Sequence, residues 1–206
     1  MQMNRLNLQK AGGNAARINA VLAITTLIVA LGLIGPTALA DNALLAQIAI
    51  TNPMPLIIQD ALKFMSAIAA TVLMVAMSHR LRNESPVLTT LATLFGFLAV
   101  ICLFVNTGLS LFAVLQASRL TQGQTGMYEI IGALGMAVIV INGLWYLLLN
   151  VAALKTGGLP KRLSYLGLVI GGLSLLPPLG IIVLLLSIVW LAWLGKTLSA
   201  DRQFSM

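Results

Sequence analysis

Three polar residues share one stripe of a long apolar segment. Asn142, Tyr146 and Asn150 stand four residues apart within residues 127–153, which places them on one side of a helix. Side-chain amides surrounded by hydrocarbon must find hydrogen-bond partners. The stripe therefore predicts either hydrogen bonds between helices, or a polar strip that binds a lipid head group, a quinone or another amphiphile.

Two further residues extend this candidate site. Asn106 lies in the preceding apolar segment and could face the same place. Glu129 lies only a few residues inside the segment 127–153 and is the best candidate for a proton or cation site. A negative charge just past the start of a helix also suits the helix dipole, so an interfacial position is the simpler interpretation of Glu129.

This chain has too few acidic, histidine and cysteine residues for most standard catalytic or metal-binding sites. There are five acidic residues, one histidine (His79) and one cysteine (Cys102), so an intrachain disulfide, a cysteine metal cluster and a bis-histidine haem are all excluded. His79 beside Arg80 is typical of a basic helix end, and an axial ligand at a subunit contact is the alternative. No phosphate loop, zinc motif or hydrolase elbow occurs. We predict no enzymatic activity, metal or cofactor, whereas a bound lipid would be compatible.

Small residues recur on one face of the segment 163–176. Small side chains let two helix backbones approach closely, and the second and third members of this set form a GxxxG motif. We expect this face to seat its helix against the rest of the bundle, with a contact to another subunit as the alternative. The set is Ser164, Gly167, Gly171 and Ser174.

The composition places these residues in a membrane. Hydrophobic residues make up 59% of the 206-residue chain and charged residues only 8%, against about 25% charged in a soluble domain. So few charges cannot cover a globule with polar surface. The net charge of +7 would suggest nucleic acid in a soluble protein, but here it indicates basic loops at an anionic membrane surface. We predict membrane lipid and transmembrane proteins as partners, and no nucleic acid.

Long apolar stretches predict a single all-α domain, a polytopic bundle over residues 1–206. About 20 apolar residues cross the hydrocarbon core. The final block is interrupted by Pro177-Pro178-Leu179-Gly180, which cannot continue a straight helix, so we read it as a hairpin of two short helices. The six predicted spans are 18–35, 61–78, 86–115, 127–153, 163–176 and 179–194.

Charge distribution predicts the orientation. With a cytoplasmic N-terminus, ten of the 12 basic residues fall inside, and only Lys63 and Arg119 fall outside. This asymmetry follows the positive-inside rule and predicts both termini in the cytoplasm. Asp60 and Lys63, three residues apart at the mouth of the second span, are expected to pair. The ten inner residues are Arg5, Lys10, Arg17, Arg80, Arg82, Lys155, Lys161, Arg162, Lys196 and Arg202.

The N-terminal segment has the form of a signal peptide. Basic residues precede the apolar run, and Ala38-Leu39-Ala40 matches an A-x-A cleavage site. The run is about 18 residues long, longer than the usual 7–15. We therefore expect an uncleaved first span; cleavage would leave five spans.

Short motifs in several parts of the chain resemble a bacterial membrane family. They are LPKRL at 159–163, LGLVIGG at 166–172, IVWLAWLG at 188–195, Ala16-Arg17-Ile18 and Asn52-Pro53. The chain resembles the bacterial multi-pass family called domain of unknown function 4386, from which it departs at the double proline. The resemblance implies a six-helix protein of the bacterial inner membrane and supplies neither an activity nor site residues.

Two functions fit these observations. The first is a non-catalytic accessory or structural subunit that packs against partner transmembrane helices in a larger complex, because contact faces are present and intramembrane charge is scarce. The alternative is a binder or carrier of a small amphiphile or lipid, which would use the polar stripe on the fourth span.

Overall fold

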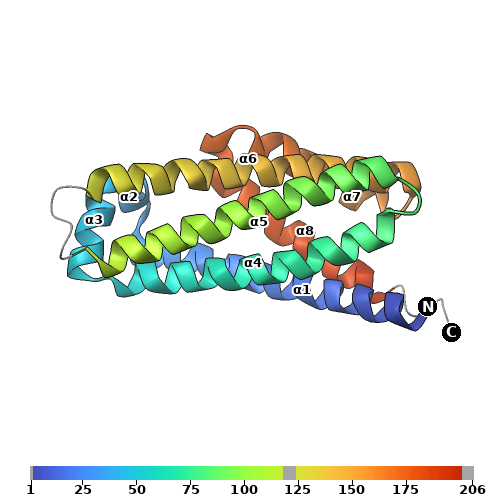
Figure 1. The fold of residues 1–206 in the computed structure, drawn as a ribbon, viewed down its shortest axis with the longest axis horizontal. Coiled ribbons are helices and arrows are strands. Elements are labelled where there is room, and N and C mark those ends of the chain that lie inside the picture. Colours follow the sequence, from blue (N-terminus) through green and yellow to red (C-terminus); the bar gives the residue numbers. More distant parts are fainter. Residues whose placement is uncertain (1, 118–123, 201–206) are drawn as a thin grey trace.

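The computed structural model describes residues 2–117 and 124–200, and this part of the chain is helical with no strand (Figure 1). Arg119 and Arg202 lie outside the described residues. The elements are α1 (Gln2–Val29) with a π-helical continuation (Ala30–Ile34), α2 (Pro36–Leu39), α3 (Asn42–Thr51), α4 (Met54–Leu81), α5 (Pro86–Leu115), α6 (Gln124–Thr156), α7 (Lys161–Ser174), a 3-10 turn (Pro177–Leu179) and α8 (Gly180–Ala200).

Five helices are long and apolar enough to cross a membrane: α1 with its continuation, α4, α5, α6 and α8. The polytopic all-α prediction is therefore confirmed in its main features. The predicted span 163–176 does not reach this length. Its helix, α7, has 14 residues, or about 21 Å at 1.5 Å per residue, against roughly 30 Å of hydrocarbon.

Helix bounds also differ from the predicted ones at the start of α4. The second span was predicted from residue 61, but α4 begins at Met54 and follows the additional helix α3. Proline near the first turn of α4 costs no hydrogen bond, because the first N–H groups of a helix have no intrahelical partner. The third apolar block forms one continuous helix, α5, of 30 residues.

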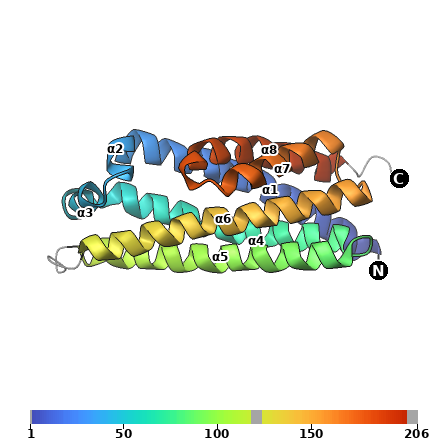
Figure 2. The ribbon, with the colours of Figure 1, turned by 90° about the horizontal axis from the view of Figure 1, so that it is seen from above.

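Six helices, the five long ones and α7, form a ring in chain order. Each packs against the next, from α1 through α4, α5, α6 and α7 to α8, and α8 packs against α1. The helices run roughly along the long axis of the molecule (Figures 1 and 2). This arrangement surrounds a central space that all six helices help to line, α7 only through Ser174 at its end.

The hairpin of α7 and α8 occupies only part of the ring's length. Figure 2 shows it stopping well short of the end that α5 and α6 reach. Gly180 at its tip lies beside Ile139, near the middle of α6; a Cβ built on Gly180 would be 3.5 Å from the Ile139 Cδ1. The tip therefore lies at half the depth of the bundle.

The end of the ring that the hairpin does not reach is closed by α2 and α3. Gly35 turns the chain between the π-helical segment and α2 with a φ of 90°, a conformation that favours glycine. The Asp41 carboxylate then caps α3 by accepting the backbone N–H of Ala43 at 2.8 Å. α3 packs against α5 and α6, so the ring is covered at this end, which we call the α3 end.

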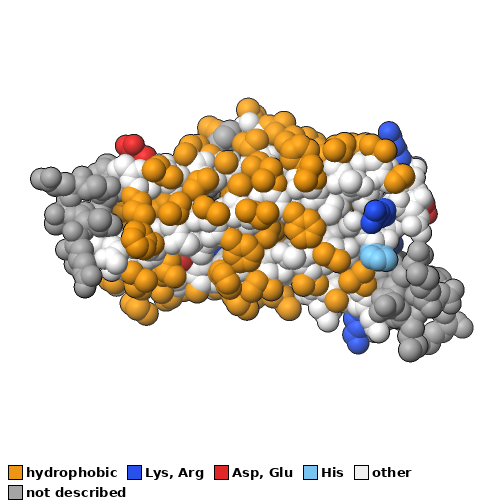
Figure 3. Space-filling model, viewed as in Figure 1, with side chains coloured by type: hydrophobic (Ala, Val, Ile, Leu, Met, Phe, Trp, Pro, Cys, Tyr) orange, Lys and Arg blue, Asp and Glu red, His pale blue; other side chains and the backbone are white. Residues whose placement is uncertain are grey.

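Lys and Arg side chains gather at the other end, which we call the basic end. In Figure 3 the blue side chains lie at the end where α1 begins and α8 finishes, and orange hydrophobic side chains cover the middle. Many large apolar side chains are exposed along the helices, including Ile28, Leu94 and Leu115 at 63%, 62% and 66%. Exposed apolar bands of this kind suit lipid rather than water.

Candidate functional site

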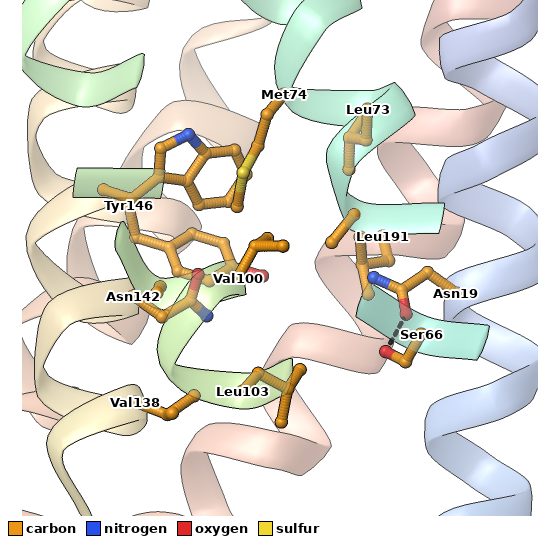
Figure 4. Close-up of a pocket in the computed structure, with 13 residues that line it drawn as sticks. Asn19, Ser66, Leu73, Met74, Val100, Leu103, Val138, Asn142, Tyr146 and Leu191 are labelled. Carbon is orange, nitrogen blue, oxygen red and sulfur yellow. Dashed lines mark hydrogen bonds between the residues drawn. The ribbon is translucent and has the colours of Figure 1, made fainter. Parts of the chain in front are cut away.

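Two adjoining cavities occupy the centre of the ring. The smaller, of about 110 Å³, lies between α1, α4, α5, α6 and α8; the larger, of about 300 Å³, extends toward the hairpin tip. In Figure 4 the polar residues of α6 face those of α1 and α4 across this space. The residues that line both cavities are Asn19, Ser66, Val138, Asn142, Tyr146 and Leu191.

One side of the cavity is a satisfied polar pair. The Ser66 hydroxyl of α4 donates a hydrogen bond to the Asn19 Oδ1 of α1. Asn19 is only 9% exposed. Hydrogen bonds between helices are a usual way to accommodate amides within a bilayer. The pair joins α1 to α4 and still presents the Asn19 amide group to the cavity.

The facing side carries the least satisfied amide of the site. Asn142 of α6 is half-buried and forms no hydrogen bond to another described residue. One turn farther along, the fully buried Tyr146 side chain interacts with Ser187 of α8. Amide and hydroxyl groups both donate and accept hydrogen bonds. The cavity can therefore bind a ligand group that is a hydrogen-bond donor or one that is an acceptor.

Asn150, predicted to share this stripe, lies elsewhere. Its Nδ2 donates to the Tyr146 carbonyl oxygen at 2.8 Å, and its side chain packs against Gly167 of α7. Eight residues along a helix turn through about 800°, so Asn150 is rotated by about 80° from Asn142. The structure thus brings Asn142 and Tyr146 to the cavity and places Asn150 at a helix contact.

The other two predicted residues also lie away from the cavity. The Asn106 Nδ2 of α5 donates to the Ile131 carbonyl oxygen of α6 at 2.6 Å, which joins these two helices nearer the α3 end. Glu129 is exposed near the start of α6. The contact of Asn106 is structural, and Glu129 contributes nothing to the central cavity.

The small residues of α7 face α6. All four are buried, and a Cβ on Gly171 would lie 2.8 Å from the Gly143 carbonyl oxygen. The close approach of α7 to α6 therefore depends on these side chains being small. Ser164, Gly167, Gly171 and Ser174 form this face.

Aromatic rings hold the hairpin at the basic side of the cavity. Tyr146 and Trp190 pack edge to face with ring centroids 4.9 Å apart, and Trp145 lies 6.0 Å from Trp190. The Trp190 Nε1–H donates to the Leu163 carbonyl oxygen at 3.1 Å, which ties α8 to the first turn of α7. These contacts pack α6, α7 and α8 together at the basic side of the cavity.

Asn19, Ser66 and Ser187 line the site but were not among the predicted residues. Asn19 carried a usable signal, because it is an isolated amide inside the first apolar run. Single serines are common in membrane helices, so Ser66 and Ser187 become recognisable only once the ring brings them together.

Asp60 and Lys63 form the expected ion pair, with the Lys63 Nζ 3.1 Å from the Asp60 Oδ1. The Asp60 side chain is 2% exposed and the Lys63 side chain 26%. Asp60 lies one and a half turns inside α4, where a carboxylate requires a partner because hydrocarbon does not solvate charge.

No protein-family model matches the sequence, and no match was found among curated proteins or solved structures. The resemblance to the bacterial membrane family stays a prediction.

Proposed function

We propose that the protein is an integral membrane protein that binds a small amphiphile in its central cavity and holds or carries it within the bilayer. The observation that supports this most is Asn142, a half-buried amide in the middle of α6 that faces a cavity of about 300 Å³ without a hydrogen bond to any described residue. Ligand cavities begin at about this volume.

The Asn142 amide favours a bound polar group in the cavity. A polar group in an apolar environment costs about 1–3 kcal/mol when it lacks a hydrogen bond. A water or a ligand head group in the cavity removes this cost. The apolar lining from Leu73, Met74, Val100 and Leu103 suits the hydrocarbon part of the same ligand.

The accessory-subunit hypothesis has less support, because one of its proposed contact faces is buried inside the bundle. The small-residue face of α7, one of the contact faces on which it depended, is used inside the bundle against α6. An accessory role predicts instead that partner proteins co-purify in mild detergent. A non-catalytic role in the bacterial inner membrane is common to both hypotheses and rests on the sequence.

Replacing Asn142 with leucine should weaken ligand binding about fivefold to tenfold, because one hydrogen bond to a neutral group contributes about 1 kcal/mol. The measurement is photolabelling in phosphatidylcholine proteoliposomes with a diazirine-bearing monoacylglycerol, followed by mass spectrometry of the labelled α6 peptide. Asn142→Gln, which keeps an amide, serves as the matched control and should lose less. Equal labelling of wild type and Asn142→Leu would contradict a role for the amide.

Orientation gives a separate prediction for a Cys102→Ser background. We expect Lys10→Cys and Lys161→Cys to react with a membrane-impermeant maleimide from the cytoplasmic face, and Asn52→Cys from the opposite face, because basic loops stay in the cytoplasm. Leu176→Cys, at the hairpin tip, should react from neither side. Labelling of the two lysine positions from opposite faces would refute this topology.

A further inference from the structure

The hairpin tip leaves one side of the cavity without a helix. α1 packs against α4 and α8, whereas α6 packs against α5 and α7, so the hairpin lies between α1 and α6. Because the tip lies beside Ile139, halfway along α6, the described part of the chain places no sixth helix of the ring between the tip and the α3 end (Figure 2). We call the opening bounded by α1, α6 and the tip the window.

The larger cavity reaches this window. Its lining includes Ala23 of α1, Ile139 of α6, and Ser174 and Gly180 at the tip. Ala23 and Ile139 are half-buried, so the cavity wall is accessible from outside at this point. The same cavity includes Asn142, and a molecule that passes the window therefore meets the amide directly.

The surroundings of the window are hydrocarbon-like. Leu176 is 56% exposed and Ile181 is 55% exposed at the tip. Backbone that is not helical is tolerated at membrane depth only where protein or a cavity covers it, and the 3-10 turn at Pro177–Leu179 packs against α6. A molecule at the window thus comes from the lipid phase.

The cavity offers no countercharge. Its lining in the described part of the chain contains no Asp, Glu, Lys, Arg or His. Asp60 and Lys63 pair with each other and line neither central cavity. Moving a charged head group to such a place costs several kcal/mol, whereas a hydroxyl or carbonyl group finds the Asn19, Asn142 and Tyr146 side chains.

We propose that the ligand of the central cavity is an uncharged amphiphile that enters sideways from the bilayer through the window between α1, α6 and the α7–α8 tip. This inference rests on the proposed binding function and specifies its ligand class and route. A long-chain alcohol, a monoacylglycerol or a quinone has the required chemistry, namely an apolar body with a neutral hydrogen-bonding head.

The test uses two probes and three variants of the full chain in phosphatidylcholine proteoliposomes. The probes are a diazirine-bearing monoacylglycerol and the phosphate monoester of the same molecule, which share the acyl chain and differ by one negatively charged phosphate group. Gly180→Phe narrows the window from the tip, and Ala23→Phe narrows it from α1. Gly108→Phe adds the same side chain to α5, where a Cβ meets nothing within 4 Å, and serves as the control.

We expect the neutral probe to label cavity residues at least about tenfold more than its phosphate, which corresponds to 1.4 kcal/mol or more. Labelling should slow several-fold in Gly180→Phe and Ala23→Phe and keep the wild-type rate in Gly108→Phe. A thermal unfolding scan of each variant identifies one that fails to fold, and the other window variant then decides.

Three results would each refute a different part of the proposal: the ligand class, the entry route or the binding function. Equal labelling by both probes would refute the uncharged ligand and leave the binding site in place. Wild-type labelling rates in both window variants would refute sideways entry. Absence of cavity labelling by either probe in the wild type would refute the proposed binding function itself.

Discussion

Replacing Gly171 with leucine is expected to destabilise the bundle by about 1–3 kcal/mol or more, because the side chain overpacks the contact between α7 and α6. A Cβ at this position would lie 2.8 Å from the Gly143 carbonyl oxygen and 2.9 Å from the Leu147 backbone nitrogen. Backbone atoms cannot rotate away, so the two helices must separate. Unfolding in mixed detergent micelles with increasing dodecyl sulfate, followed by tryptophan fluorescence, measures the change.

The adjacent residue supplies a matched control. Gly172 lies on the same helix and is exposed, and a Cβ there meets nothing within 4 Å. Gly172→Leu should therefore leave the free energy of unfolding close to the wild-type value. If both variants were equally destabilised, the loss would come from glycine replacement in α7 in general and not from its contact with α6.

The second large effect concerns the ion pair. Lys63→Met should lower the free energy of unfolding by up to about 3 kcal/mol, because it leaves the Asp60 carboxylate buried without its partner. The 26% exposure of the Lys63 side chain places the effect at the lower end of the range for buried pairs, because partial solvation already weakens the pair. The same micelle unfolding experiment measures it.

A double variant distinguishes the loss of the Asp60–Lys63 ion pair from the loss of packing by the Lys63 side chain. Asp60→Leu combined with Lys63→Met removes both charges and should recover stability to within about 1 kcal/mol of wild type, since replacing a buried pair by apolar residues is often neutral. Failure of the second substitution to restore stability would mean that Lys63 contributes through its packing and not through Asp60.

The sequence predicted which segments are helical better than it predicted how far each helix extends across the membrane. Hydropathy depends on composition and length, so the apolar segments that became α4, α5, α6 and α8 were recognisable. The end of the segment that became α7 is as apolar as the long helices. Only the packing of the hairpin tip beside Ile139 shows that this segment extends to the middle of the bundle and no farther. Residue spacing also identified the Asp60–Lys63 pair, because three residues along a helix fix the geometry locally.

The candidate site was predictable only in part for a related reason. The periodicity of α6 identified Asn142 and Tyr146, but it also grouped Asn150 with them, because a four-residue spacing drifts slowly around a helix. Which residues face the cavity depends on the rotation of each helix in the ring. Asn19 of α1 and Ser66 of α4 are 47 positions apart in the chain, and their contact follows from tertiary packing alone.

The order of the helices around the ring bears on how the protein is made. Each long element packs against the one synthesised just before it, so a growing chain can assemble its neighbours one after another through contacts close in sequence. Among the neighbouring pairs of the ring, the most distant in sequence is that of α8 with α1. Glycine forms it: a Cβ on Gly195 would lie 3.0 Å from the Gly13 carbonyl oxygen. The ring therefore closes only after α8 has been synthesised and has docked against α1.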